Sequence, residues 1–203
     1  MNSSKFQTEL HPLLAFNSRD IRKVDPEFNF VNLSNWKNKG YLKKLGKGLY
    51  TFADDIKQEL LYFAANKIID PSYISCESAL SFYGILKKED QIVSVNPDKT
   101  YEYKSDYGGF KFHKSRPALI KDYCLVLYNQ HHFKIATPEK AIVDFFFFNP
   151  KYQTRDQIMS LEFDVDELAN KVLDKYDIKR IANEYCNNLL GRRITNFIKI
   201  FIK

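Results

Sequence analysis

The sequence is poor in cysteine. Its three cysteines, Cys76, Cys124 and Cys186, are far apart and odd in number, and none belongs to a CxxC pair. A disulfide framework needs an even set of closely spaced cysteines, and a structural zinc site needs paired ligands. The spacing therefore argues against both and indicates three free thiols in a reducing cytoplasm.

Long apolar runs are also missing, and residues 1–12 lack the pattern of a leader segment. A helix that spans a bilayer needs about 18 apolar residues, whereas the longest conspicuous run, residues 141–148, is interrupted by Asp144. Residues 1–12 contain no apolar segment followed by a small-residue cleavage site. We therefore expect no export, no membrane partner and a cytoplasmic location.

Enzyme motifs are absent from the sequence as well. The seven glycines form neither a phosphate-binding loop nor a dinucleotide fingerprint, and no Ser/His/Asp order is present. Each of these chemistries needs such a motif to hold the reacting groups. We therefore expect a protein that is not an enzyme, with no catalytic residue, no cofactor and no metal site.

Positive charge is concentrated at one end of the chain. Of the 203 residues, 44% are hydrophobic and 28% are charged, which is typical of a folded globular protein. The net charge is +6, and residues 1–52 hold nine Lys and Arg against four Asp and Glu. A basic segment beside a nearly neutral remainder is typical of a nucleic-acid-binding module joined to a second domain.

Most of this basic excess lies in residues 33–52. The stretch contains no acidic residue and five lysines, which are Lys37, Lys39, Lys43, Lys44 and Lys47. Gly40 is placed to end a helix in the left-handed conformation, and residues 46–48 join two short apolar runs into a hairpin. Helix, stop and basic hairpin together predict the second half of a winged helix-turn-helix. The alternative is a solvated, lysine-rich hairpin without a ligand.

Three helices are expected before the hairpin, at residues 5–16, 19–24 and 26–39. Ser18 should cap the second helix and Asp25 the third, although the apolar residues before Leu33 leave a later start open. Leu33 and Trp36 are one turn apart and should face the core of this unit.

The third helix is rich in side-chain amides, which can read adenine edges in a major groove. The alternative is that its asparagines are only solvated. The candidate residues on this helix are Asn32, Ser34, Asn35, Lys37, Asn38 and Lys39. Lys43, Lys44 and Lys47 of the hairpin are expected to hold phosphates, and Ser18 and Arg19 to touch the DNA backbone.

The remainder of the chain predicts a mixed α/β domain. Helices are expected at residues 56–69, 75–83, 137–148, 154–161, 165–176 and 177–203, the last with a break at Gly191, and strands at 91–95, 100–105, 109–114, 123–128 and 133–135. The fold class is therefore α+β, with a winged helix-turn-helix in residues 1–53. Residues 54–203 form the second domain, with an antiparallel-rich sheet and C-terminal helices.

Several groups resemble catalytic or metal sites and are rejected. Only three residues separate Asp98 from Glu102, too few to bring two carboxylates onto the metal of a nuclease. Asp164 is better explained as a helix cap than as an acid of a nucleotidyltransferase. His131 and His132 are adjacent on a strand and so point apart, which argues against a metal site.

Two further acids lie near the apolar helix expected at residues 137–148. Glu139 sits in its first turn, where an acid stabilises a helix. Asp144 interrupts the apolar run and needs a partner if it is buried. We interpret Asp144 as structural, paired with an Arg, a Lys or a backbone donor, rather than as catalytic.

Three motifs follow one another along the chain. They are Lys39-Gly40-Tyr41-Leu42 to Lys47-Gly48-Leu49-Tyr50, then Pro71 to Gly84 with PSYIS, SAL and YG, then Ile135 to Asp144 with IATPEKA. In this order they resemble the AbiEi-type antitoxins of type IV toxin-antitoxin and phage abortive-infection systems, also described as predicted transcriptional regulators of viral defence. The resemblance covers roughly residues 18–148.

The resemblance implies a winged helix that binds inverted repeats in its own promoter and represses its own operon. It also implies a C-terminal domain that neutralises a nucleotidyltransferase-like toxin without a stable complex, and it leaves a homodimer open. The alternative function is a protein-interaction module without sequence-specific DNA binding, whose C-terminal helices bind a toxin or a second copy of the chain.

Overall fold

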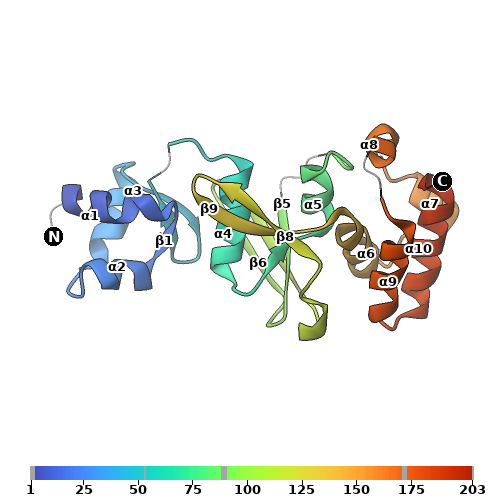
Figure 1. Cartoon of the computed structure of the whole chain (residues 1–203). Coiled ribbons are helices and arrows are strands. Elements are labelled where there is room, and N and C mark those ends of the chain that lie inside the picture. Colours follow the sequence, from blue (N-terminus) through green and yellow to red (C-terminus); the bar gives the residue numbers. More distant parts are fainter. Residues whose placement is uncertain (1–2, 53, 88–90, 171–172, 203) are drawn as a thin grey trace.

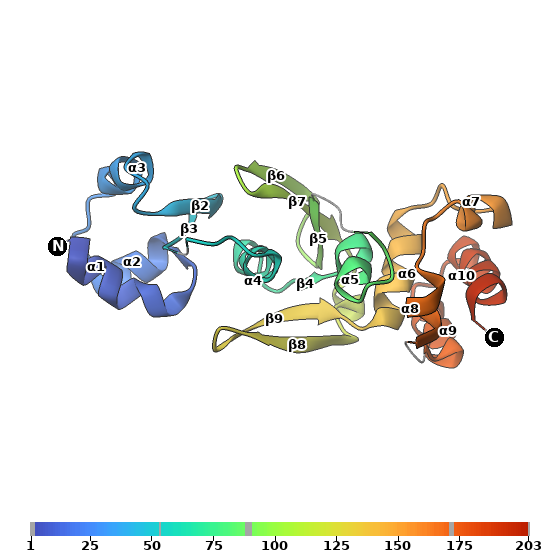
Figure 2. The ribbon, with the colours of Figure 1, turned by 90° about the horizontal axis from the view of Figure 1, so that it is seen from above.

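The structure is a computed structural model that describes residues 3–52, 54–87, 91–170 and 173–202. A helical unit with a small sheet lies at the N-terminal end, a six-stranded sheet lies in the middle, and a group of helices lies at the C-terminal end (Figure 1, Figure 2). This combination confirms the expected α+β class. Within the described ranges, no helix is long and apolar enough to cross a bilayer.

The N-terminal unit has three helices and a three-stranded antiparallel sheet of order β1-β3-β2. Its elements are α1 (Ser3–Leu10), the 3-10 helix η1 (His11–Leu13), β1 (Phe16–Asn17), α2 (Ser18–Val24), α3 (Val31–Asn38), β2 (Lys43–Gly46) and β3 (Leu49–Thr51). They enclose a core of Phe6, Leu10, Phe16, Ile21, Phe28, Leu33 and Leu42, on which Trp36 also packs. The inward orientation expected for Leu33 and Trp36 is confirmed.

A mixed sheet of order β6-β7-β5-β4-β9-β8 forms the middle of the molecule. Its strands are β4 (Tyr73–Ile74), β5 (Gln91–Asn96), β6 (Tyr101–Ser105), β7 (Gly108–Lys114), β8 (Tyr123–Tyr128) and β9 (His131–Ala136). The β5–β7 and β4–β9 pairs are parallel, and the other three pairs are antiparallel. α4 (Gln58–Ile68) packs against β4, β5 and β9 and also contacts the hairpin of β2 and β3.

The remaining helices gather at the far end of the sheet (Figure 2). They are α5 (Cys76–Phe82), the 3-10 helix η2 (Pro117–Leu119), α6 (Pro138–Phe148), α7 (Arg155–Met159), α8 (Val165–Asn170), α9 (Lys175–Glu184) and α10 (Asn188–Phe201). α6 is surrounded by α5, α9 and α10, and seven consecutive residues of it are buried. Thr137 caps α6 by accepting the N–H of Lys140, so the helix start expected there is confirmed.

The cap of α2 differs from the expectation. Asn17, not Ser18, accepts the backbone N–H groups of Arg19 at 2.8 Å and Asp20 at 3.3 Å. The Asp20 carboxylate in turn accepts the N–H of Asn17 at 2.9 Å. This reciprocal capping box displaces the expected cap by one residue, because Asn17 has an acid three residues later and Ser18 does not.

The third helix begins later than Asp25. The Asp25 carboxylate accepts the N–H of Glu27 at 3.2 Å, which makes residues 25–27 a turn. α3 starts at Val31, whose N–H is bonded to the Asn29 side chain at 3.0 Å. Both Asp25 and Asn29 therefore use their side chains to form turns, and Pro26 fits a turn as well as a helix start.

The C-terminal helices break at different places from those expected. Gly191 lies inside α10, and the break falls at Cys186, which adopts φ +50°, with Asn187 capping α10. The helix expected at residues 165–176 is two helices, because Asp174 caps a new one. Residues 171–172 of that span lie outside the described residues, as does Ala53, the expected junction.

Two short strands were not expected. β1 adds a third strand to the hairpin by pairing with β3, and β4 lies at the centre of the large sheet. Each contains only two residues, so neither produces an alternating pattern in the sequence. Phe82, near the end of α5, is 38% exposed.

Candidate nucleic-acid interface

α3 is fixed at its C-terminal end by a glycine. Gly40 adopts φ +76°, its N–H donates to the carbonyl of Lys37, and the N–H of Tyr41 donates to the carbonyl of Trp36, both at 2.9 Å. This pair of bonds satisfies the last carbonyls of a helix and favours glycine at the left-handed position. The expected helix stop is confirmed, and the chain turns directly from α3 into the hairpin.

The face of α3 opposite its core contacts is exposed and uncharged. Its four residues follow the i, i+3, i+4, i+7 spacing of one helical face, and they are Val31, Ser34, Asn35 and Asn38. Ser34, Asn35 and Asn38 are among the residues expected on this surface. Val31 was not expected there, although its side chain is 63% exposed. Its spacing from Asn35 and Asn38 is the signal that identifies it.

The other candidates on α3 lie at the sides of this stripe. Asn32 is half-buried, and Lys39 is exposed at the C-terminal end of the helix. The Lys37 ammonium lies 3.6 Å from the Asp106 carboxylate, in the turn between β6 and β7. Lys37 is therefore already paired with an acid of the large sheet, and Lys39 is the more accessible cation.

The lysines of the hairpin divide between its two faces. Lys43 and Lys44 are adjacent on β2, so their side chains point in opposite directions. Lys43 donates to the backbone carbonyl of Asp54. Lys44 lies opposite Tyr50 on the face of the N-terminal core, and Lys47 is exposed in the turn. Lys44 and Lys47 are therefore better placed than Lys43 to meet a ligand.

One face of the hairpin is covered by α4. Leu45 and Leu49 are 0% and 2% exposed and belong to the same apolar cluster as the buried residues of α4. Gly46 approaches this helix so closely that an added Cβ would lie 2.5 Å from Cδ1 of Ile68. This packing fixes the hairpin to the rest of the molecule and leaves its turn, Lys47 and Gly48, exposed.

The N-terminal end of α2 borders a shallow hollow of about 470 Å³. Ser18 and Arg19, both expected to touch DNA, line it together with Arg22, Lys23 and Phe30. The Arg22 guanidinium lies 4.8 Å from the centre of the Phe30 ring, which holds its charge at the surface. Arg22 and Lys23 were not expected at the interface, yet they extend its positive charge.

A second polar cluster is fully buried between the large sheet and the C-terminal helices. Asp144 accepts hydrogen bonds from Tyr73 at 2.9 Å, from Ser75 at 2.7 Å and from Tyr185. The Lys140 ammonium, one turn earlier on α6, lies 3.2 Å from this carboxylate and also bonds to Tyr185. Asp144 and Lys140 are 0% and 1% exposed.

This buried cluster confirms the pairing expected for Asp144, with a lysine as the partner. Burial, followed by the nearby Asp144 charge, raises the pKa of both Tyr73 and Tyr185 above the ordinary value. Both hydroxyls therefore keep their protons and donate to the carboxylate. Ser75 occupies the cap position of α5 but gives its hydroxyl to Asp144 instead of to the helix.

Two of the other acids, Asp98 and Asp164, lie in a turn and at a helix start. The N–H of Asp98 donates to the Asn96 side chain at 2.9 Å, within a turn. The Asp164 carboxylate accepts the N–H of Glu167 at 3.0 Å at the start of α8, so its interpretation as a cap is confirmed. A search of the described residues finds no group of three or more His, Cys, Asp or Glu placed to hold a metal ion.

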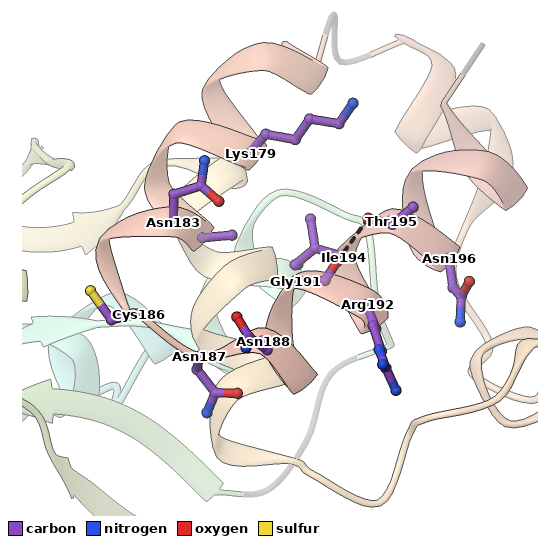
Figure 3. A pocket seen from close by; sticks show the side chains of 11 residues that line it. Lys179, Asn183, Cys186, Asn187, Asn188, Gly191, Arg192, Ile194, Thr195 and Asn196 are labelled. Carbon is purple, nitrogen blue, oxygen red and sulfur yellow. Dashed lines mark hydrogen bonds between the residues drawn. The ribbon is translucent and has the colours of Figure 1, made fainter.

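A polar groove of about 580 Å³ lies between α9 and α10 (Figure 3). Lys179 and Asn183 come from α9, Asn187 lies at the turn, and Asn188, Arg192, Thr195 and Asn196 come from α10. No acid is among its lining residues. Lys179 and Arg192 point in different directions in Figure 3, so the groove does not direct its two cations at one small anion.

Comparison with protein-family models gave no match, and a search of curated proteins gave none either. The resemblance to AbiEi-type antitoxins therefore rests on the three motifs and their order.

Proposed function

We propose that residues 1–53 form a winged helix-turn-helix domain that binds double-stranded DNA. In this assignment α2 and α3 are the helix pair, α3 is the recognition helix, and the β2–β3 hairpin is the wing. The observation that carries the proposal is the exposed stripe of α3, which presents amides and no acid beside the lysines of the hairpin. Such a surface suits a polyanion.

The exposed stripe supplies the groups that would read bases. Asn35 and Asn38 can each pair with an adenine edge in the major groove, and Val31 can contact a thymine methyl group. Ser34 can bond to several base edges, whereas Asn32, at the side of the helix, is better placed for the DNA backbone.

Cations around the stripe would neutralise phosphates. Lys39, Lys44 and Lys47 are the principal contacts, with Ser18 and Arg19 at the start of α2. Lys37 would first have to leave the Asp106 carboxylate, and Lys43 the Asp54 carbonyl, before either could contact a phosphate. Each therefore contributes less to the affinity for DNA. These contacts fix the position of α3 but carry little sequence information.

The order of the three motifs supports a more specific role. We infer a cytoplasmic, non-enzymatic transcriptional regulator that binds inverted repeats in its own promoter and acts as the antitoxin of a type IV toxin-antitoxin system in antiviral defence. Residues 54–203 would form the domain that neutralises a nucleotidyltransferase-like toxin without a stable complex.

The proposal is tested by the salt dependence of DNA binding. Fluorescence anisotropy with a duplex from upstream of the gene would compare the parent with a Lys44→Gln/Lys47→Gln variant. Each lost phosphate contact lowers the slope of log affinity against log salt by about one, so the variant should lose about two and bind more weakly. Lys151→Gln/Lys179→Gln, which removes the same charge at exposed sites far from α3, should behave as the parent. Parent-like affinity and slope in the first variant would contradict the proposal.

A protein-interaction module is the second candidate, and the groove between α9 and α10 favours it because its amides and cations suit a polar partner. Light scattering with and without the product of the neighbouring gene separates the two. A stable complex would support the interaction module and oppose the type IV scheme.

A further inference from the structure

β8 is an open edge of the large sheet. It pairs with β9 on one side, and it ends the strand order, so none of the described residues pairs with its other side. In Figure 2 it is the outermost strand on its side of the molecule. An edge strand of this kind presents unpaired backbone groups to any strand that approaches it.

The outward backbone groups of β8 can be assigned from the register. The N–H of Thr137 donates to the carbonyl of Asp122 at 3.0 Å, so hydrogen-bonded pairs between the strands start at Asp122 and recur every second residue. The pair of Leu125 and Lys134 is therefore of the other type, and the N–H of Lys134 indeed points away, to the Asn66 side chain at 2.6 Å. It follows that Tyr123, Leu125 and Leu127 direct their N–H and C=O groups to the open edge.

The same three residues carry exposed apolar side chains. Tyr123, Leu125 and Leu127 alternate along β8, so they share one face, and they are 37%, 62% and 67% exposed. The strand reads YCLVLY and contains no charged residue and no proline. Exposed edges are normally protected by charges, prolines or bulges, so this unprotected edge indicates a surface that is covered in use.

We propose that β8 pairs in antiparallel orientation with β8 of a second copy of this chain, about a two-fold axis at Leu125. The backbone N–H and C=O groups that point to the open edge of one copy then face those of the other. Leu125 lies opposite Leu125 of the other copy, and Tyr123 lies opposite Leu127. The six side chains form one apolar patch, and aromatic and aliphatic pairs of this kind stabilise adjacent strands. The two sheets become one continuous sheet.

A second copy fits this edge because the edge is complementary to itself. A two-fold interface brings the same surface together twice, so like charges at its centre would repel, and β8 has none. At its ends, Lys121 and Asp122 of one copy come beside Tyr128 and Asn129 of the other, which are uncharged. The inference rests on β8 alone and does not depend on DNA binding.

The oligomeric state of the full chain tests the proposal. A pairing of one strand and three side chains from each copy is small, so we expect a dissociation constant on the order of 10 μM. Sedimentation equilibrium should show the mass doubling as concentration rises from about 1 to about 300 μM. Leu125→Lys/Leu127→Lys should keep the single-chain mass throughout, whereas Met159→Lys/Leu189→Lys, which alters exposed apolar residues elsewhere, should dimerise as the parent does. A parent that stays monomeric, or a Leu125→Lys/Leu127→Lys variant that still doubles in mass, overturns the proposal.

Cross-linking tests the register without relying on lysine variants. In a chain with Cys124→Ser and Cys186→Ser, Leu125→Cys should form a disulfide dimer under mild oxidation, because Cα atoms of opposed hydrogen-bonded residues lie about 5.5 Å apart. Leu127→Cys should not, because the two copies of residue 127 would lie about 13 Å apart along the strands. Equal cross-linking of the two variants would overturn the two-fold axis at Leu125.

Discussion

The buried cluster around Asp144 gives the sharpest prediction for stability. Asp144 is the shared acceptor: it takes hydrogen bonds from three hydroxyls and compensates the Lys140 ammonium. Asp144→Asn keeps the volume of the side chain but removes its charge and turns one oxygen into a donor. The change leaves the buried Lys140 ammonium without a compensating negative charge, and the new amide N–H groups face hydroxyls that also donate.

Removing one partner of a buried ion pair lowers the free energy of unfolding by about 3–5 kcal/mol, and we expect a loss in that range for Asp144→Asn. Lys140→Met should cost less, about 2 kcal/mol, because the Asp144 carboxylate keeps the hydroxyls of Tyr73, Ser75 and Tyr185 as donors. Urea unfolding followed by far-ultraviolet circular dichroism measures both changes, provided that the slope of the transition is unaltered. A Lys140→Met variant that loses as much stability as Asp144→Asn would refute the reasoning that the carboxylate is the centre of the cluster.

Three further predictions concern local features. Asn17→Ala should lower the free energy of unfolding, measured with urea, by about 1 kcal/mol, whereas Ser18→Ala should change it little. Equal losses in the two variants would contradict the capping box at Asn17. Gly46→Ala should lower the free energy of unfolding by about 1–3 kcal/mol, because its Cβ would meet Cδ1 of Ile68. Ile68→Val removes that atom, so it should lower the free energy of unfolding less in the Gly46→Ala background than in the parent. If the two losses simply add, the contact is contradicted. Burial, and then Lys111, lowers the pKa of His113 to about 4, below the unfolded value of about 6.5. The neutral ring therefore stabilises the folded state above about pH 6.5, and this contribution is lost as pH falls toward about 4. The urea midpoint of His113→Gln should therefore fall less than that of the parent between about pH 7 and about pH 5. An equal fall would argue against a half-buried neutral imidazole.

Features with local causes could be predicted from the sequence. The stop at Gly40, the helix start at Thr137 and the hairpin after α3 depend on residues within a few positions of one another, and each is confirmed. The cap at Ser18 failed for an equally local reason, since Asn17 competes for the same N–H groups and Asp20 completes its capping box.

Features with distant causes could not be predicted. β4 is a strand only because β5 and β9 lie on either side of it. Lys140 is one helical turn before Asp144, so that partner could have been named, but the hydroxyls of Tyr73 and Tyr185 come from far along the chain. The candidate site also contains both kinds of feature. The exposed stripe of α3 could be predicted from helical spacing, whereas the partners of Lys37 and Lys43 depend on how the hairpin and the large sheet pack.

The most direct test of the proposed function is the affinity of the full chain for its own upstream duplex relative to a shuffled duplex of the same composition at one salt concentration. Specific recognition predicts a ratio of at least about 10³, and Asn35→Ala/Asn38→Ala should lower that ratio by about tenfold or more while leaving binding to the shuffled duplex unchanged. Equal affinity of the parent for the two duplexes would contradict the account.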